Sequence, residues 1–284
     1  MLMNPNIYRR RRAVNILGLV LSGASMAIGL IGLLWILWTL FYNGLSALNV
    51  AFFMNSTPAP GTEGGGMANA IIGSLMMVGV ATLVSTPIGI LAGVYLAEFG
   101  KTSKFAAATR FVVDIMLSAP SIVIGLFVYA IAVATLKHFS GWAGSFALSL
   151  IAIPVVVRTT ENMLNLVPGS LREAAFALGA PRWKVSMAVT LRAVRGGVVT
   201  GVLLAIARMI GETAPLLFTA LNNQFFSLDM GQPMANLPVV IYNFAMSPYE
   251  NWQKLAWGGA ALIALIVLAI NITARVVFRD KVQA

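Results

Sequence analysis

LLAIARMIGETAPLLF, residues 203–218, is apolar enough to lie in a lipid bilayer, yet it contains an arginine and a glutamate. Arg208 and Glu212 are four residues apart, so a helix would place them on the same face. A charged side chain at the centre of a bilayer costs at least about 2.5–3.5 kcal/mol, so such residues are rare and usually functional. The segment therefore predicts a membrane helix whose polar face meets protein or water rather than lipid.

The rest of the chain has the composition of an integral membrane protein. Of its 284 residues, 59% are hydrophobic and only 10% are charged, and the mean hydropathy is +0.86. Soluble domains contain about 25% charged residues. A bilayer core about 30 Å thick needs roughly 20 apolar residues per helix. By this criterion we predict an all-α polytopic protein with six transmembrane helices, at residues 16–42, 68–97, 111–136, 142–157, 197–220 and 255–278. The fourth run is the shortest, and we expect flanking residues to extend it.

The basic residues are segregated between the loops. Sixteen of the 19 Lys and Arg residues fall on one side of the six predicted helices, whereas the other side has only Lys137 and Lys254. The positive-inside rule then places both termini in the cytoplasm. The net charge of +10 is explained by this topology, so we expect the lipid bilayer and not a nucleic acid as partner. The predicted organisation is a basic cytoplasmic tail (1–15), a first anchor helix (16–42), a core of five helices (68–278) with a cytoplasmic loop (158–195), and a second tail (279–284).

Several kinds of catalytic site are excluded by the sequence. The chain has no cysteine and one histidine, His138 in a short outer loop, which excludes disulfide, zinc and thiol chemistry. The one GKT, residues 100–102, has Tyr95 where a P-loop needs its first glycine. No GxSxG nucleophile motif occurs. We therefore expect a non-catalytic subunit with no metal or cofactor of its own.

The cytoplasmic loop contains VPGSLREAAFALGAPRWKV, residues 167–185. Ser170 stands three residues before Glu173, the spacing of a capping box at a helix start, and Gly179 is suited to end the helix. These signals predict a helix of about nine residues, roughly 13 Å long. Ala174 and Ala175 leave its backbone open to close approach. Such a helix can enter a groove of a partner, although an ordinary interfacial helix would have the same periodicity.

The alternatives for Arg208 and Glu212 are a substrate site and a structural pair. The guanidinium offers a planar fork of donors that suits a tetrahedral oxyanion, and Gly211, Thr213 and Pro215 could break the helix and free backbone groups toward a cavity. In the structural alternative, the two charges only neutralise each other within the helix. Another acidic residue, Asp114, follows Arg110 by four residues at a predicted helix start. We expect an Arg110–Asp114 pair there, with no role in transport.

The cytoplasmic loop resembles a known family. Its Glu-Ala-Ala at 173–175, followed by Gly179 and by Val189 and Leu191, is similar to the EAA loop of bacterial ABC-importer permeases. Further segments resemble, in order and spacing, the PstA-type permease family of the phosphate-specific ABC transporter: GTEGGG (61–66), LSAPSIVIGLFVYA (117–130), HFSGWAG (138–144), RTTENMLNLVPGSLREAA (158–175), ARMIGETAPLLFTALNNQF (207–225) and NWQKLAWGGA (251–260).

This resemblance implies a multi-pass permease with the type I ABC-importer fold in the bacterial inner membrane. It implies a sister permease (PstC-type), two copies of an ATPase subunit (PstB-type) that bind ATP and Mg, and an external phosphate-binding protein (PstS-type). The coupling helix with Ser170, Glu173, Ala174, Ala175 and Gly179 would receive the ATPase. Arg208 would help to carry phosphate, and Glu212 would hold Arg208 between transport events.

Three other functions stay open on the residues. A permease for molybdate or sulfate would use the same fork of donors. An ion-coupled secondary carrier would use Arg208 and Glu212 directly but would need no coupling helix, and we find no inverted repeat of the kind many such carriers have. A membrane scaffold would not need an arginine within the bilayer.

Overall fold

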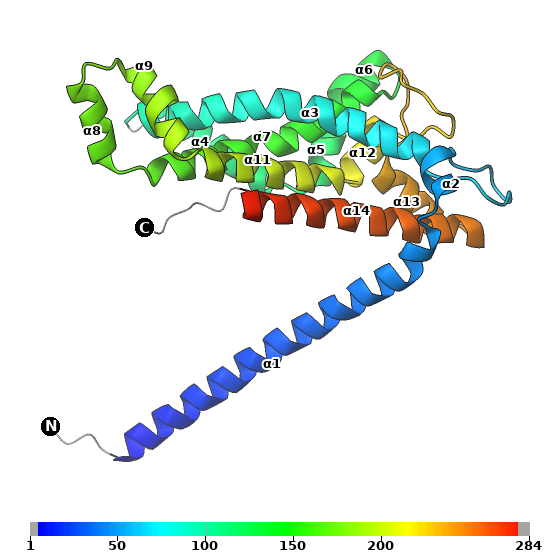
Figure 1. The fold of residues 1–284 in the computed structure, drawn as a ribbon, viewed down its shortest axis with the longest axis horizontal. Coiled ribbons are helices and arrows are strands. Elements are labelled where there is room, and N and C mark those ends of the chain that lie inside the picture. The colour runs from blue at the N-terminus through cyan, green and yellow to red at the C-terminus, as the bar shows by residue number, and fades with distance from the viewer. Residues whose placement is uncertain (1–4, 101, 278–284) are drawn as a thin grey trace.

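The computed structural model describes residues 5–100 and 102–277, and within these ranges the chain forms helices and loops without a β-strand (Figure 1). The helices are α1 (Pro5–Gly44), α2 (Val50–Met54), α3 (Ala68–Val94), α4 (Lys104–Ser118), α5 (Ser121–Val128), α6 (Ala134–Leu136), α7 (Gly141–Asn165), α8 (Gly169–Ala177), α9 (Arg182–Lys184), α10 (Leu191–Ala193), α11 (Arg195–Ile210), α12 (Ala214–Thr219), α13 (Leu237–Ala245) and α14 (Glu250–Val277). A 3-10 turn, η1, covers Leu45–Ala47, and three π-helical segments are η2 (Tyr95–Phe99), η3 (Tyr129–Val133) and η4 (Val185–Thr190). The predicted tail 279–284 lies outside the described residues.

Four of the described helices are long and apolar enough to cross a membrane alone, and the number rises to six if each of two bent pairs counts as one span. The all-α membrane class is therefore confirmed. The span predicted over 111–136 corresponds to one of the bent pairs, in which α4 and the helical segment Ser121–Leu136 meet at an angle of 106°. The break is at Ala119 and Pro120, which are both extended, with ψ of 135° and 133°. A residue that precedes proline is pushed out of the helical region, which explains the bend.

Helix α7 is the centre of the fold. Its 25 residues extend well beyond the predicted run 142–157, as expected from the shortness of that run, and 67% of its apolar window is buried inside the protein. It packs along α3 and also against α11, α12 and α4. The approach of α3 is close because α3 presents glycines: a Cβ on Gly93 would lie 2.6 Å from Cβ of Thr160. Small residues allow such close packing between membrane helices.

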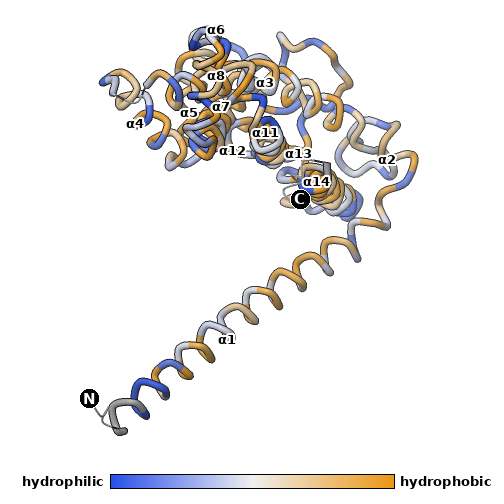
Figure 2. Tube along the Cα trace, turned by 60° about the vertical axis from the view of Figure 1, so that its left-hand side comes forward, coloured by the Kyte–Doolittle hydropathy of each residue, from blue (hydrophilic) through white to orange (hydrophobic). Residues whose placement is uncertain are grey.

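Helix α1 leaves the body of the protein and points away from it (Figure 1). Its apolar residues follow one another along most of its length, with hydrophilic residues near the N-terminal end (Figure 2). None of its apolar window is buried, and it meets α14 at its C-terminal end, where Gly44 lies against Trp257 and Ala261. A helix that is apolar on all sides needs lipid or another protein chain around it.

The loop that precedes α3 and the loop that follows α12 are joined by Asn69, which is buried at the start of α3. Its side-chain oxygen accepts from the Thr57 amide at 3.1 Å, and its nitrogen donates to the carbonyls of Asn223 and Gln224 at 3.0 and 3.3 Å. Below this connection α13 buries Val240 and Phe244, and it packs against α14 and α3. The loop that follows α12 is thereby held in place over the core.

Candidate translocation and coupling sites

Arg208 and Glu212 lie at the point where α11 ends. Arg208 is in the last turn of the helix, and its Nε donates to Oε1 of Glu212 at 3.3 Å. The Arg208 side chain is 43% exposed and that of Glu212 is 14% exposed. Nη1 and Nη2 of Arg208 donate to none of the described residues. The site therefore combines one weak ion pair with two guanidinium nitrogens that remain available to a ligand.

The helix break predicted around Gly211 is present. The chain turns after Ile210, with the amides of Gly211 and Glu212 bonded to Arg208 and Met209 carbonyls at 3.1 and 3.2 Å, and α12 begins at Ala214. Pro215 in the first turn of α12 needs no hydrogen-bond partner for its nitrogen. It also packs tightly on α5, because a Cβ on Gly125 would lie 2.7 Å from the Pro215 Cα. Contact with α5 thus fixes the position of α12, and with it the turn that carries Glu212.

The predicted helix of the cytoplasmic loop is α8, and it has the expected nine residues. The predicted capping box is wrong. The helix begins at Gly169 with Pro168 as N-cap and has no side-chain cap, so Ser170 lies inside the first turn and cannot act as the cap. Gly179 does end the helix: it has φ of +77°, and the amides of Gly179 and Ala180 bond to the carbonyls of Phe176 and Ala175 in the last turn.

The outer face of α8 is exposed. Ser170, Glu173 and Ala174 are exposed, Ala175 is half-buried, and α8 has no buried residue. Leu178, directly after the helix, is 89% exposed. A short helix with small side chains and one free carboxylate thus projects from the body at the end of the bundle, as Figure 1 shows. This geometry suits insertion into a groove of another protein.

Arg172 and Glu98 are two functional candidates that sequence reasoning missed. Nε and Nη2 of Arg172 donate to the Glu98 carboxylate at 2.8–3.2 Å, and Nη1 and Nη2 also donate to the carbonyls of Val167 and Leu164. Their side chains are only 18% and 9% exposed. The two residues are 74 positions apart, so no local spacing rule could pair them.

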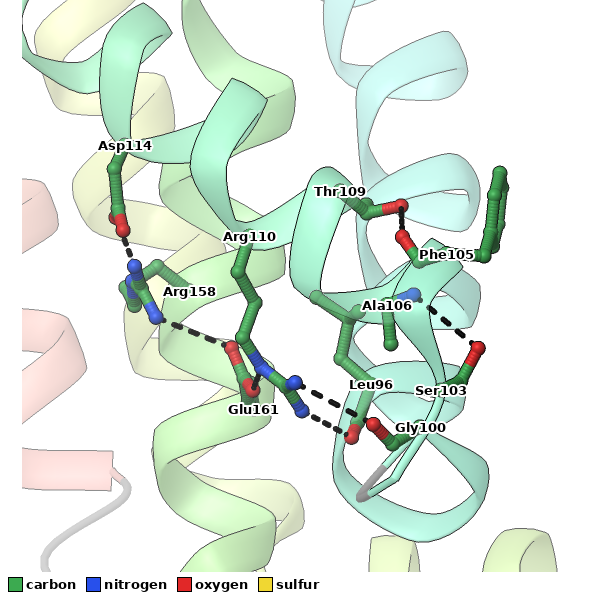
Figure 3. Close-up of polar contacts among 10 residues, drawn as sticks. All are labelled: Leu96, Gly100, Ser103, Phe105, Ala106, Thr109, Arg110, Asp114, Arg158 and Glu161. Atoms are coloured by element: carbon green, nitrogen blue, oxygen red, sulfur yellow. Dashed lines mark hydrogen bonds and ion pairs between the residues drawn. The ribbon is translucent and has the colours of Figure 1, made fainter.

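A second ion-pair network joins α4 to α7 (Figure 3). Glu161 is buried and accepts from Arg110 Nε at 2.6 Å and from Arg158 Nη1 at 3.3 Å. Arg158 also pairs with Asp114. The predicted Arg110–Asp114 pair is therefore wrong: Asp114 lies in the last two turns of α4, not at its start, and each residue finds its partner on α7 instead.

Among the described residues no group of three or more His, Asp or Glu could hold a metal ion.

The fold is that of known importer permeases. The methionine ABC transporter MetNI, in an inward-facing structure, matches with a TM-score of 0.60 over 75% of this chain and 95% of that chain, at 19% identity. A bacterial alginate ABC transporter matches with a TM-score of 0.59 over 95% of this chain and 96% of that chain, at 14% identity. At these identities the likeness concerns the fold alone.

Comparison of sequences is more specific. The family described as binding-protein-dependent transport system inner membrane component matches residues 85–279. The phosphate transport system permease protein PstA of Pasteurella multocida (strain Pm70) is 58% identical over 98% of this chain and 99% of its own length. The protein of the same name from Xylella fastidiosa (strain 9a5c) is 50% identical over 98% of both chains. The chain therefore belongs to the family of binding-protein-dependent transport system inner membrane components, and within it to the permease proteins called PstA.

Proposed function

We propose that this permease translocates inorganic phosphate across the inner membrane as one subunit of an ATP-driven importer, and that Arg208 contacts the phosphate. The observation that carries this proposal is the free fork of Arg208 at the break between α11 and α12. Two of its three nitrogens donate to no described residue, and 43% of the side chain is exposed. Relatives that align along nearly the whole chain are named for phosphate transport.

The position of Arg208 along α11 supports a role in the pathway. Arg208 is thirteen residues from the helix start at Arg195, or about 20 Å at 1.5 Å per residue. A charge at such a depth is tolerated where it faces water or another polar group. The pair with Glu212 is long, at 3.3 Å, and has the less favourable Arg-before-Glu order. A phosphate with several acceptor oxygens would compete well with this single carboxylate contact, so Glu212 holds the guanidinium only between transport events.

The exposure of Arg208 also implies a second chain. In the isolated subunit the guanidinium is exposed on the protein surface. The pathway is therefore completed by a sister permease that covers this surface. The exposed α8, with Glu173 and Ala174 on its outer side, is the segment that receives a separate ATPase subunit, which would bind ATP and Mg. An external phosphate-binding protein would deliver the substrate to the outer loops.

Two alternatives are distinguishable by uptake measurements. A permease for molybdate or sulfate would use the same guanidinium fork, since all three are tetrahedral oxyanions. An ion-coupled carrier would use Arg208 and Glu212 without ATP. The decisive assay reconstitutes the chain with its sister permease, ATPase and binding protein in proteoliposomes, and follows uptake of radioactive phosphate.

We expect uptake that needs ATP, that persists when ionophores remove ion gradients, and that excess phosphate inhibits far more than equal molybdate or sulfate. Uptake that stops with the gradients but not with ATP removal would contradict an ATP-driven importer. Stronger inhibition by molybdate or sulfate than by phosphate would assign the permease to that oxyanion.

A further inference from the structure

Arg172 belongs to α8, but its side chain turns away from the exposed face of the helix and joins three segments. It donates to both carboxylate oxygens of Glu98 in η2, to the carbonyl of Leu164 in the last turn of α7, and to the carbonyl of Val167 just after α7. We infer that the Arg172–Glu98 pair transmits movement of α8 to α3, and that Arg172 is a positioning residue of the transport cycle. This inference rests on the proposed role of α8 as the helix that receives the ATPase.

The attachment of α8 to the body depends on polar contacts. Helix α8 packs against η4 but buries no residue completely, so apolar packing alone holds it less firmly than the central helices. The bidentate contact between Arg172 and Glu98, with both side chains less than a fifth exposed, is directional and is among the stronger polar contacts found in proteins. A partner that shifts or tilts α8 would therefore pull on Glu98, the residue of η2 to which Arg172 is bonded.

The η2 segment is held equally firmly on its other side. From α4, Arg110 donates to the carbonyls of Leu96 and Gly100 at 2.7 and 3.4 Å, while its Nε pairs with Glu161 of α7 (Figure 3). These bonds satisfy carbonyls that a helix end leaves free, so η2 cannot simply fray when Glu98 is pulled.

The η2 segment directly follows the C-terminal end of α3. Helix α3 packs along α7 and α11, and α11 ends at the turn that follows Arg208. Packed helices and ion pairs of this kind carry coupling between distant sites when the connected elements have two arrangements. Displacement of α8 would thus reach the pathway through Arg172, Glu98, η2 and α3, in that order.

The test compares Glu98→Gln, Arg172→Gln and the double variant in the complete reconstituted complex, with Arg275→Gln as control. Arg275 is an exposed arginine in the last turn of α14 that pairs with no described residue. ATP hydrolysis and substrate uptake are measured in the same vesicles, and their ratio is the readout. Uptake is followed with whichever of phosphate, molybdate or sulfate the wild-type complex transports, so a wrong substrate assignment does not affect the result.

We expect each single variant to assemble and hydrolyse ATP but to move at least about fivefold less substrate per ATP, the lower end of measured couplings between sites. The double variant should lose no more than the worse single variant, because both changes break one contact. The control should keep the wild-type ratio. Arg172→Lys, which keeps the charge without the fork, should fall between.

An unchanged ratio in Glu98→Gln would overturn the inference, because this variant leaves both carbonyl contacts of Arg172 intact. Losses that multiply in the double variant would show that the two residues act independently, which also overturns it. Loss of assembled complex in Glu98→Gln, with an unchanged ratio per complex that remains, would show a purely structural pair. If Arg172→Gln does not assemble, Glu98→Gln alone decides the question.

Discussion

Glu161 is the acidic residue whose removal should most reduce the stability of this subunit. Its side chain is 5% exposed and pairs with two arginines, Arg110 and Arg158, which are 29% and 30% exposed. Breaking a buried pair by removal of one partner costs about 3–5 kcal/mol. Because both arginines can regain some water, we expect Glu161→Ala to cost about 2–4 kcal/mol. By the scaling of about 2–4 °C per kcal/mol for chains of comparable size, the melting temperature should fall by roughly 4–16 °C.

Asp114→Asn is the matched control, because Asp114 pairs with Arg158 in the same network but is 55% exposed. Exposed ion pairs contribute about 0–1 kcal/mol, so this variant should melt within about 4 °C of the wild type. The assay is thermal unfolding of the detergent-purified subunit, followed by fluorescence-detected size exclusion. Equal melting temperatures for Glu161→Ala and Asp114→Asn would refute the assignment of Glu161 as the buried centre of the network.

Three further predictions concern coupling, packing and topology. Glu173→Lys reverses the one exposed carboxylate of α8, and we expect the subunit to insert normally but no longer to co-purify with its ATPase; normal co-purification and uptake would contradict the role of α8. Gly125→Ala places a Cβ 2.7 Å from the Pro215 Cα, so we expect it to cost about 1–3 kcal/mol of stability by overpacking and to lower uptake. Gly79→Ala meets nothing within 4 Å, so it should change neither stability nor uptake. Equal effects of the two variants would argue against close packing of α5 and α12. In this cysteine-free chain, an impermeant thiol reagent added outside should label a cysteine at Thr62 but not one at Thr102; the reverse pattern would invert the topology.

Much of the fold could be predicted from hydropathy and charge, because bilayer thickness sets the length of a membrane helix. Hydropathy indicates the length of a membrane segment but not the direction of its helix axis. The 106° bend between α4 and α5 was therefore missed, although Pro120 gives a local signal for it. The capping box failed for a similar local reason. Pro168 provides the N-cap, which moves the helix start two residues before the expected position and leaves Ser170 within the first turn.

The contacts of the candidate sites also fall into two groups: those within one segment could be predicted from the sequence, and those between distant segments could not. The Arg208–Glu212 pair and the break after it follow from spacing and from Gly211 and Pro215, which are neighbours in sequence. The contacts of Arg172 with Glu98, and of Arg110 with Glu161, join residues 74 and 51 positions apart. Such contacts depend on how α4, α7 and α8 pack, and no pattern within one segment encodes them. From the sequence alone, the charged residues of the cytoplasmic loop could be located, but Asp114 was assigned the wrong partner.

The central claim is that Arg208 contacts the transported anion, and ATP-dependent phosphate uptake by the double variant Arg208→Gln, Glu212→Gln tests it most directly. This variant removes both charges, so no unpaired charge remains to destabilise the subunit. We predict normal amounts of assembled complex with uptake reduced about 10- to 150-fold, the loss of charge-assisted hydrogen bonds worth about 1.5–3 kcal/mol. Wild-type uptake in the double variant, with only the single variants impaired, would show that the pair is structural and that phosphate does not need Arg208.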